Sequence, residues 1–145
     1  MSYKPVMTAA EVGDYVRKVF PQADGYGWQA REVGPGTITV GMKVSSDHLR
    51  PGGTVSGPTM FALADVSAYL LVLAHIGEVA LAVTTNLSIN FLTKPPLGDL
   101  RAEGRLLKLG KRLAVCEIHI LPDEGDTLVA QATATYSIPP AESRQ

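Results

Sequence analysis

The chain has very little cysteine and almost no excess of charge. Cys116 is its single cysteine, so no disulfide can form within the chain, and this composition is typical of a reducing compartment. Thirteen Lys and Arg residues against fourteen Asp and Glu residues give a formal net charge of −1. This balance provides no general attraction to nucleic acid or to an anionic membrane, so we expect neither as a partner.

The motifs of several common enzyme classes are also missing. The sequence has no P-loop, no dinucleotide-binding glycine pattern and no Gly-x-Ser-x-Gly motif of serine hydrolases. Its three histidines and Cys116 share no metal-ligand spacing, so we predict no metal site. The first fifteen residues contain no apolar stretch typical of a secretory signal, which favours a cytoplasmic location.

One long apolar segment is present. Val55–Gly77 begins with small residues and a proline, then stays apolar for several helical turns around a single acid, Asp65. A helix that is apolar nearly all round is buried in a core or spans a membrane. The apolar part is slightly short for a span and also contains Ser67 and His75, so we predict a buried central helix and no membrane.

The rest of the chain predicts a short amphipathic helix and six strands. The helix begins at a capping box formed by Thr8 and Glu11 and ends at Pro21. The strands are expected at Trp28–Val33, Thr37–Val44, Ala80–Leu92, Leu100–Leu107, Arg112–Leu121 and Thr127–Ile138.

Short turns between these strands favour an antiparallel sheet, and the long helix is the only element able to cover one of its faces. We therefore predict a single α+β domain over residues 1–145, with a curved antiparallel sheet wrapped around a long central helix. A helical segment occupies residues 1–24 and a loose tail occupies residues 139–145.

Two consecutive motifs carry a family resemblance. The helix opens with GPTMFALAD, and the strand that follows reads AVTTNLSINFLTKPPLGDL. Together they resemble the hotdog-fold acyl-CoA thioesterases of the phenylacetate-degradation (PaaI-like) family, over about Val33 to Ile138. The resemblance implies hydrolysis of an acyl-CoA to a carboxylic acid and free coenzyme A. It also implies a homodimer or homotetramer and no cofactor, with coenzyme A entering only as part of the substrate.

The loop before the helix departs from the family pattern. The family helix usually opens with His-Gly-Gly, where this chain has Ser56, Gly57 and Pro58, and an upstream Asn is replaced near Arg50. The chain therefore resembles a variant subgroup. A non-catalytic acyl-binding or coenzyme-A-binding hotdog protein remains an alternative, as does a hotdog hydratase or dehydratase, which usually carries a histidine where Ser56 stands.

The central helix supplies two candidate catalytic groups. A helix start presents unpaired backbone N–H groups and a partial positive charge, and Pro58 has no N–H, so the Gly57 N–H is the candidate oxyanion donor. Asp65 follows two turns later as the candidate general base or nucleophile. The alternative is a structural acid whose hydrogen bonds come from neighbouring hydroxyls such as Thr59 or Ser67.

The long strand after the helix supplies the other candidates. Thr84 falls at the family's hydroxyl position and is expected to orient the water or the thioester. Asn86, on the same face of a regular strand, is a candidate substrate contact. A long unpaired edge strand invites pairing with a second copy. The resemblance implies two sites per dimer at this interface, so we expect each site to combine Asp65 of one chain with Thr84 of the other.

Coenzyme A carries phosphates, which predicts cations at the rim of the site. The candidates cluster at one turn and in the loop Ser45–Ser56, which also contains His48 and is expected to border the site. A solvated hairpin turn is the alternative for the first group. The predicted substrate-binding residues are Arg50, Ser56, Asn86, Lys108, Lys111 and Arg112.

Overall fold

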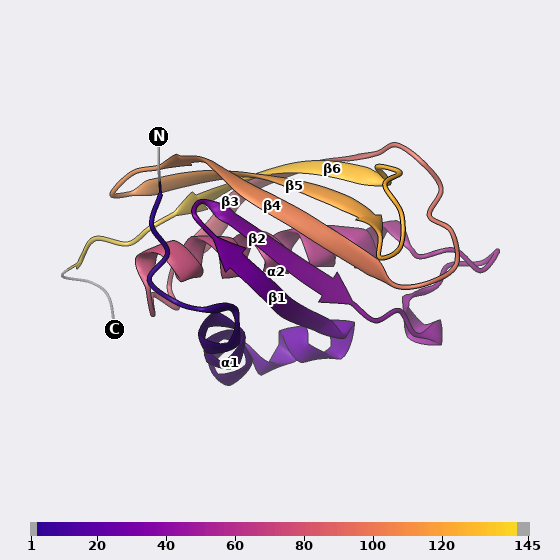
Figure 1. Ribbon diagram of the computed structural model, residues 1–145, viewed down its shortest axis with the longest axis horizontal. Helices are drawn as coiled ribbons and strands as arrows, with labels where there is room; N and C mark the ends of the chain where they lie inside the picture. Colours follow the sequence, from indigo (N-terminus) through magenta and orange to yellow (C-terminus); the bar gives the residue numbers. More distant parts are fainter. Residues whose placement is uncertain (1–2, 142–145) are drawn as a thin grey trace.

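A six-stranded antiparallel sheet curves around one long helix (Figure 1). The computed structural model describes residues 3–141. Its helices are α1 (Ala9–Val19) and α2 (Gly57–Ile76), and two short 3-10 helices are η1 (Pro21–Tyr26) and η2 (Ser46–His48). The strands are β1 (Trp28–Gly34), β2 (Thr37–Met42), β3 (Val83–Phe91), β4 (Leu100–Leu109), β5 (Leu113–Pro122) and β6 (Ala130–Ser137).

The strand order in the sheet is β1-β2-β4-β5-β6-β3, and every neighbouring pair is antiparallel. Strand β3, which directly follows α2 in the chain, therefore lies at an edge and pairs only with β6 within the described residues. This arrangement confirms the predicted fold, a curved antiparallel sheet around a central helix.

Helix α2 forms the centre of the core. Its leucines Leu63, Leu70, Leu71 and Leu73 are fully buried. By length and composition α2 could cross a membrane, but the sheet and α1 enclose it here. The helix begins where the Ser56 hydroxyl accepts the Thr59 N–H and where Pro58 occupies the first turn, two features that favour a helix start.

The helix lies very close to the sheet at Gly104 of β4. A Cβ atom added there would lie 2.8 Å from Ile118 Cδ1 and 3.3 Å from Leu71 Cδ2. The absence of a side chain at this position lets α2 approach the sheet, and the surrounding large apolar side chains fill the remaining space.

Helix α1 packs against β1 and α2, and η1, which follows it, also contacts α2. The predicted capping box is present, because Thr8 Oγ1 accepts the Glu11 N–H and the Glu11 carboxylate accepts the Thr8 N–H. Helix α1 ends at Val19 and Pro21 starts η1, so helical structure continues to Tyr26, slightly beyond the predicted helical segment. Residues 142–145 of the predicted tail lie outside the described residues.

Candidate functional site

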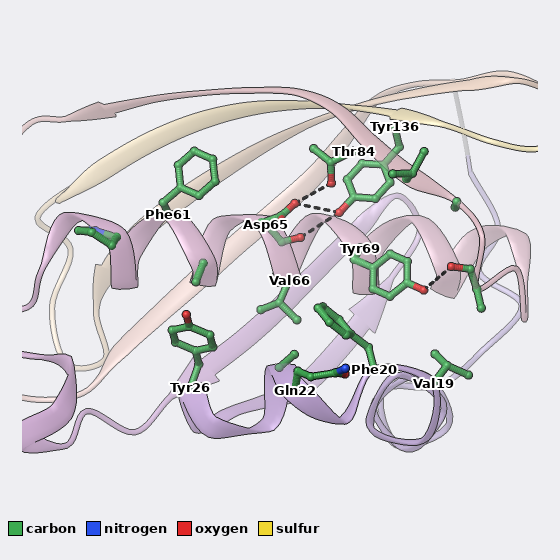
Figure 2. A pocket seen from close by; sticks show the side chains of 16 residues that line it. Val19, Phe20, Gln22, Tyr26, Phe61, Asp65, Val66, Tyr69, Thr84 and Tyr136 are labelled. Carbon is green, nitrogen blue, oxygen red and sulfur yellow. Dashed lines mark hydrogen bonds between the residues drawn. The ribbon is translucent and has the colours of Figure 1, made fainter.

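A cavity of about 660 Å³ opens beside the first half of α2 (Figure 2). Three parts of the chain form it: the segment 19–26, the first turns of α2 and the start of β3 with the end of β6. Asp65 is the only charged residue among the lining residues. These are Val19, Phe20, Gln22, Ala23, Tyr26, Pro58, Phe61, Ala62, Asp65, Val66, Tyr69, Ala80, Ala82, Val83, Thr84 and Tyr136.

The Asp65 carboxylate is held through one of its two oxygens. Its Oδ1 atom accepts a hydrogen bond of 2.8 Å from the Thr84 hydroxyl and one of 3.1 Å from the Tyr136 hydroxyl. The Tyr136 hydroxyl also lies 3.1 Å from the backbone oxygen of Asp65. No hydrogen bond to Oδ2 is formed within residues 3–141, so this oxygen remains available to a bound molecule.

Tyr136 is suited to be a permanent donor to this carboxylate. Burial raises the pKa of Tyr136 well above its ordinary value, and the nearby negative charge of Asp65 raises it further. The phenol therefore keeps its proton throughout the neutral and mildly alkaline range. Its ring also stacks on Tyr69, with ring centroids 6.1 Å apart, which fixes the direction of the hydroxyl.

The hydroxyls first considered as partners of Asp65 are engaged elsewhere or have no partner. Thr59 bonds to Ser56 and to the backbone oxygen of His48. The buried Ser67 hydroxyl has no hydrogen-bond partner among the described residues. The expectation that Thr59 or Ser67 would bond to Asp65 is therefore wrong. The hydroxyls that bond to Asp65 come from strands of the sheet.

Thr84 reaches Asp65 within one chain, which corrects the prediction that the two would meet across a subunit interface. A β-bulge between Thr84 and Asn86 explains the geometry. Thr84 pairs with Tyr136, which faces inward, whereas Asn86 pairs with the next residue, Thr135. The extra residue reverses the side on which Asn86 lies, so Asn86 is exposed and does not line the cavity.

Gly57 and Ser56 lie at the start of α2, beyond the end of the cavity. The Ser56 hydroxyl is occupied as the helix cap. The Gly57 N–H forms no hydrogen bond within the described residues. Phe91 of β3 covers this point, because a Cβ atom on Gly57 would lie 3.4 Å from its ring.

The predicted phosphate-binding cations do not line the cavity. Lys108, Lys111 and Arg112 lie at the β4–β5 turn, where Arg112 Nε donates to the Ile138 backbone oxygen. Arg50 is exposed in the loop before α2. The whole loop 45–56 lies outside the cavity, which corrects its predicted place at the border.

His48, also expected near substrate, is buried and structural. Its Nδ1 atom accepts the Ser45 N–H at 2.9 Å, and its ring stacks on Tyr26 at 6.2 Å between centroids.

Cys116 is buried and belongs to no second site among the residues that the structure describes. Burial raises the pKa of the Cys116 thiol to about 12, so it stays neutral in the core. Within residues 3–141, no three His, Cys, Asp or Glu side chains gather in a way that could hold a metal ion.

Sequence reasoning missed Tyr136 and the whole segment Val19–Tyr26 as parts of the site. Tyr136 is the only aromatic residue in its strand, within ATATYSI, which is a weak local signal. The segment Val19–Tyr26 contains two aromatic residues around a proline, but no local pattern places it opposite Asp65.

Comparisons with known proteins agree with this architecture. The model of the thioesterase superfamily matches residues 52–129. A Pseudomonas aeruginosa protein provisionally named an esterase is 29% identical over 104 residues, which cover 70% of this chain and 75% of that protein.

Two solved structures extend the likeness to nearly the full chain. A protein of Silicibacter sp. TM1040, provisionally named a thioesterase, is 51% identical with a TM-score of 0.87, and the match covers 94% of this chain and 95% of that one. A phenylacetic acid degradation-related protein of Ralstonia eutropha JMP134 is 28% identical with a TM-score of 0.76, covering 86% and 98%. The chain therefore has the hotdog fold and belongs to the thioesterase superfamily.

Proposed function

We propose that the chain is an acyl-CoA thioesterase that uses Asp65 to hydrolyse a thioester to a carboxylic acid and free coenzyme A. The observation that carries the proposal is the state of Asp65. It is the one charged residue lining an apolar cavity, with Oδ1 bound by Thr84 and Tyr136 and Oδ2 left free. A carboxylate held in this way keeps one oxygen in a fixed direction for chemistry.

Two routes use the free oxygen. As general base, Asp65 Oδ2 takes a proton from water while the water oxygen bonds to the thioester carbon. The resulting oxyanion collapses, the C–S bond breaks, and the coenzyme A thiolate takes up the proton. As nucleophile, Oδ2 itself bonds to the thioester carbon, the thiolate leaves, and water hydrolyses the acyl anhydride.

Either route needs a donor for the oxyanion, and one chain alone does not bring the proposed donor close enough. Gly57 and Asp65 are eight residues apart on α2, which separates them by about 12 Å along the axis at 1.5 Å per residue. A thioester carbonyl beside Asp65 Oδ2 is therefore out of reach of the Gly57 N–H of the same helix.

A two-fold dimer solves this problem. If two α2 helices lie antiparallel with the axis near their residue 61, midway between Gly57 and Asp65, the Gly57 of each helix comes beside the Asp65 of the other. Phe61 is 41% exposed, an apolar side chain suited to that position. Strand β3 offers a free edge, and its exposed Phe91 lies beside the helix start at Gly57.

The remaining features of the proposal follow the family. The coenzyme A moiety stays outside the apolar cavity, where Arg50 or the cations of a second copy are candidates for its phosphates. The reaction as written uses no metal and no redox cofactor. We place the protein in the cytosol, where acyl-CoA is available and a single buried thiol is stable.

The test is release of free thiol from a panel of aliphatic and aromatic acyl-CoAs, followed with a thiol-trapping dye. The buried Cys116 does not compete for the dye in the folded protein. Release from at least one thioester supports the proposal. Binding of acyl-CoA without release from any of them contradicts it and favours the non-catalytic acyl-binding alternative.

A further inference from the structure

One wall of the cavity that Asp65 lines comes from a part of the chain outside the family match. The cavity is lined by Val19 at the end of α1, by Phe20, which is the N-cap of η1, and by three residues of η1, Gln22, Ala23 and Tyr26. Figure 2 shows Val19, Phe20, Gln22 and Tyr26 along one side of α2, across the helix from Thr84 and Tyr136. The superfamily model begins only at residue 52, so we call residues 19–26 the N-terminal wall.

The N-terminal wall is anchored from behind. The indole N–H of the buried Trp28 donates to the Ala23 backbone oxygen at 3.0 Å, and Arg17 binds Asp24 at 3.4 Å. The Arg17 guanidinium lies 4.5 Å above the centre of the Trp28 ring. These contacts hold the segment in place without using the side chains that face the cavity.

The stack of Tyr26 on the buried His48 adds a second anchor at the other end of the wall. His48 is tied to the start of α2, because its backbone oxygen accepts the Ser56 N–H at 2.9 Å. The wall and the helix that carries Asp65 are therefore coupled through direct contacts, and the width of the cavity between them is defined.

Large apolar surfaces remain uncovered on this wall. Phe20 is 45% exposed and Tyr26 is 39% exposed, although both line a cavity. Phe61, Val66 and Tyr69 of α2 line the same cavity, and Figure 2 shows Val66 on the side of the helix nearer Phe20 and Tyr26. With Asp65 as the only charged lining residue, the space between the two sides favours an uncharged, apolar occupant.

We infer that the N-terminal wall selects the acyl group, with Phe20 and Tyr26 binding the apolar part of the acyl chain beyond the carbon next to Asp65. This inference rests on the proposed function only in taking the occupant to be the acyl part of a thioester. It assigns a preference for apolar acyl groups longer than acetyl, set by residues that lie outside the matched family region.

The test measures binding, so that it does not depend on turnover. Dissociation constants are determined by calorimetry for acetyl-, butyryl-, hexanoyl- and octanoyl-CoA in an Asp65→Asn background. With the wall intact, each methylene that contacts the wall is expected to tighten binding about fourfold. Phe20→Ala and Tyr26→Ala are each expected to remove this gain for the longer chains while leaving acetyl-CoA binding unchanged.

The matched control is Leu107→Ala, because Leu107 is also 45% exposed but lies on β4 outside the cavity. Circular dichroism establishes that all the variants fold. The inference is overturned if Phe20→Ala and Tyr26→Ala show the same dependence on chain length as the Leu107→Ala control, or if no acyl-CoA binds.

The outcome also separates this inference from the proposed function. Suppose that the unmodified protein hydrolyses an acyl-CoA, but the Phe20→Ala and Tyr26→Ala variants bind acyl-CoAs with the same dependence on chain length as the unmodified wall. This result contradicts the role of the N-terminal wall and leaves the thioesterase proposal standing. If the wall variants change how binding depends on acyl chain length, but the unmodified protein hydrolyses no acyl-CoA, the result supports acyl selection by the N-terminal wall and contradicts the thioesterase proposal.

Discussion

At the scale of single residues, the site depends on how Asp65 shares its two oxygens. Thr84 and Tyr136 both donate to Oδ1, so the carboxylate is oriented from the sheet, while Oδ2 accepts no hydrogen bond within residues 3–141. The acid itself was predictable, because a lone carboxylate in an apolar helix is costly unless it is bonded or used. The role of Tyr136 could not be predicted, because this residue lies 71 residues from Asp65 along the chain and contacts it only in the folded sheet.

Removing the Tyr136 hydroxyl tests this arrangement. We expect Tyr136→Phe to lower kcat about tenfold, since hydrogen bonds to charged groups contribute about 1.5–3 kcal/mol and each 1.4 kcal/mol is a factor of ten. Tyr69→Phe is the control, since its hydroxyl bonds only to the Ala80 oxygen. An unchanged kcat in Tyr136→Phe would show that the phenol is merely structural.

Cys116 gives a second prediction at this scale. The thiol is fully buried, and burial raises its pKa to about 12, so the native protein should not react with a thiol reagent at pH 8. In urea the ordinary thiol pKa of about 8.5 returns and labelling should be fast. Mass spectrometry of both samples measures the difference, and rapid labelling of the native state would place Cys116 outside the core.

At the scale of elements, the helices and strands could be predicted because their signals are local. The Thr8–Glu11 box, the apolar run of α2 and the alternation of the strands each lie within one segment. The bulge at Thr84 could not be read in this way. It reverses Asn86 to the outer side, and it arises from the pairing of β3 with β6, which the sequence of β3 alone does not encode.

The close packing of α2 on the sheet at Gly104 predicts that a larger residue at this position destabilises the fold. Gly104→Ala places a methyl group against Ile118, Ile38 and Leu71 at 2.8, 3.1 and 3.3 Å, so neighbouring atoms must move. We expect a loss of about 1–3 kcal/mol in the free energy of unfolding, the usual cost of overpacking a core. Urea denaturation measures it. Gly110→Ala, whose Cβ atom meets only an ordinary contact at 3.5 Å, is the control and should cost little. Equal stability of the two variants would contradict the close packing.

At the scale of the whole molecule, the proposed site is complete only when two copies associate. Gly57 and Asp65 are about 12 Å apart along one helix, so Gly57 can serve as the proposed oxyanion donor only for the Asp65 of another chain. The sequence suggested association through its long edge strand, and β3 does lie at the edge of the sheet. Sequence reasoning assigned the wrong residue to the partner, however, since Thr84 meets Asp65 within one chain.

Mixing two inactive variants tests the sharing of sites. Gly57→Pro removes the proposed donor at a helix position that accepts proline, and Asp65→Asn removes the proposed base or nucleophile. After exchange of subunits, half of the dimers are hybrids with one intact site each, so the mixture should recover about a quarter of the unmodified activity by two-fold symmetry. Mixtures that remain as inactive as the separate variants would show that both groups act within the same chain.

The most direct measurement compares the turnover of Asp65→Asn with that of the unmodified protein on the best acyl-CoA of the panel. The amide keeps the shape of the side chain but neither accepts a proton from water nor attacks the thioester effectively. We predict a fall in kcat of about 10²–10⁴, the usual contribution of a general base, with acyl-CoA binding retained. Asp14→Asn, on the exposed side of α1, should leave kcat unchanged. Turnover of Asp65→Asn within a few-fold of the unmodified protein would contradict the role assigned to Asp65.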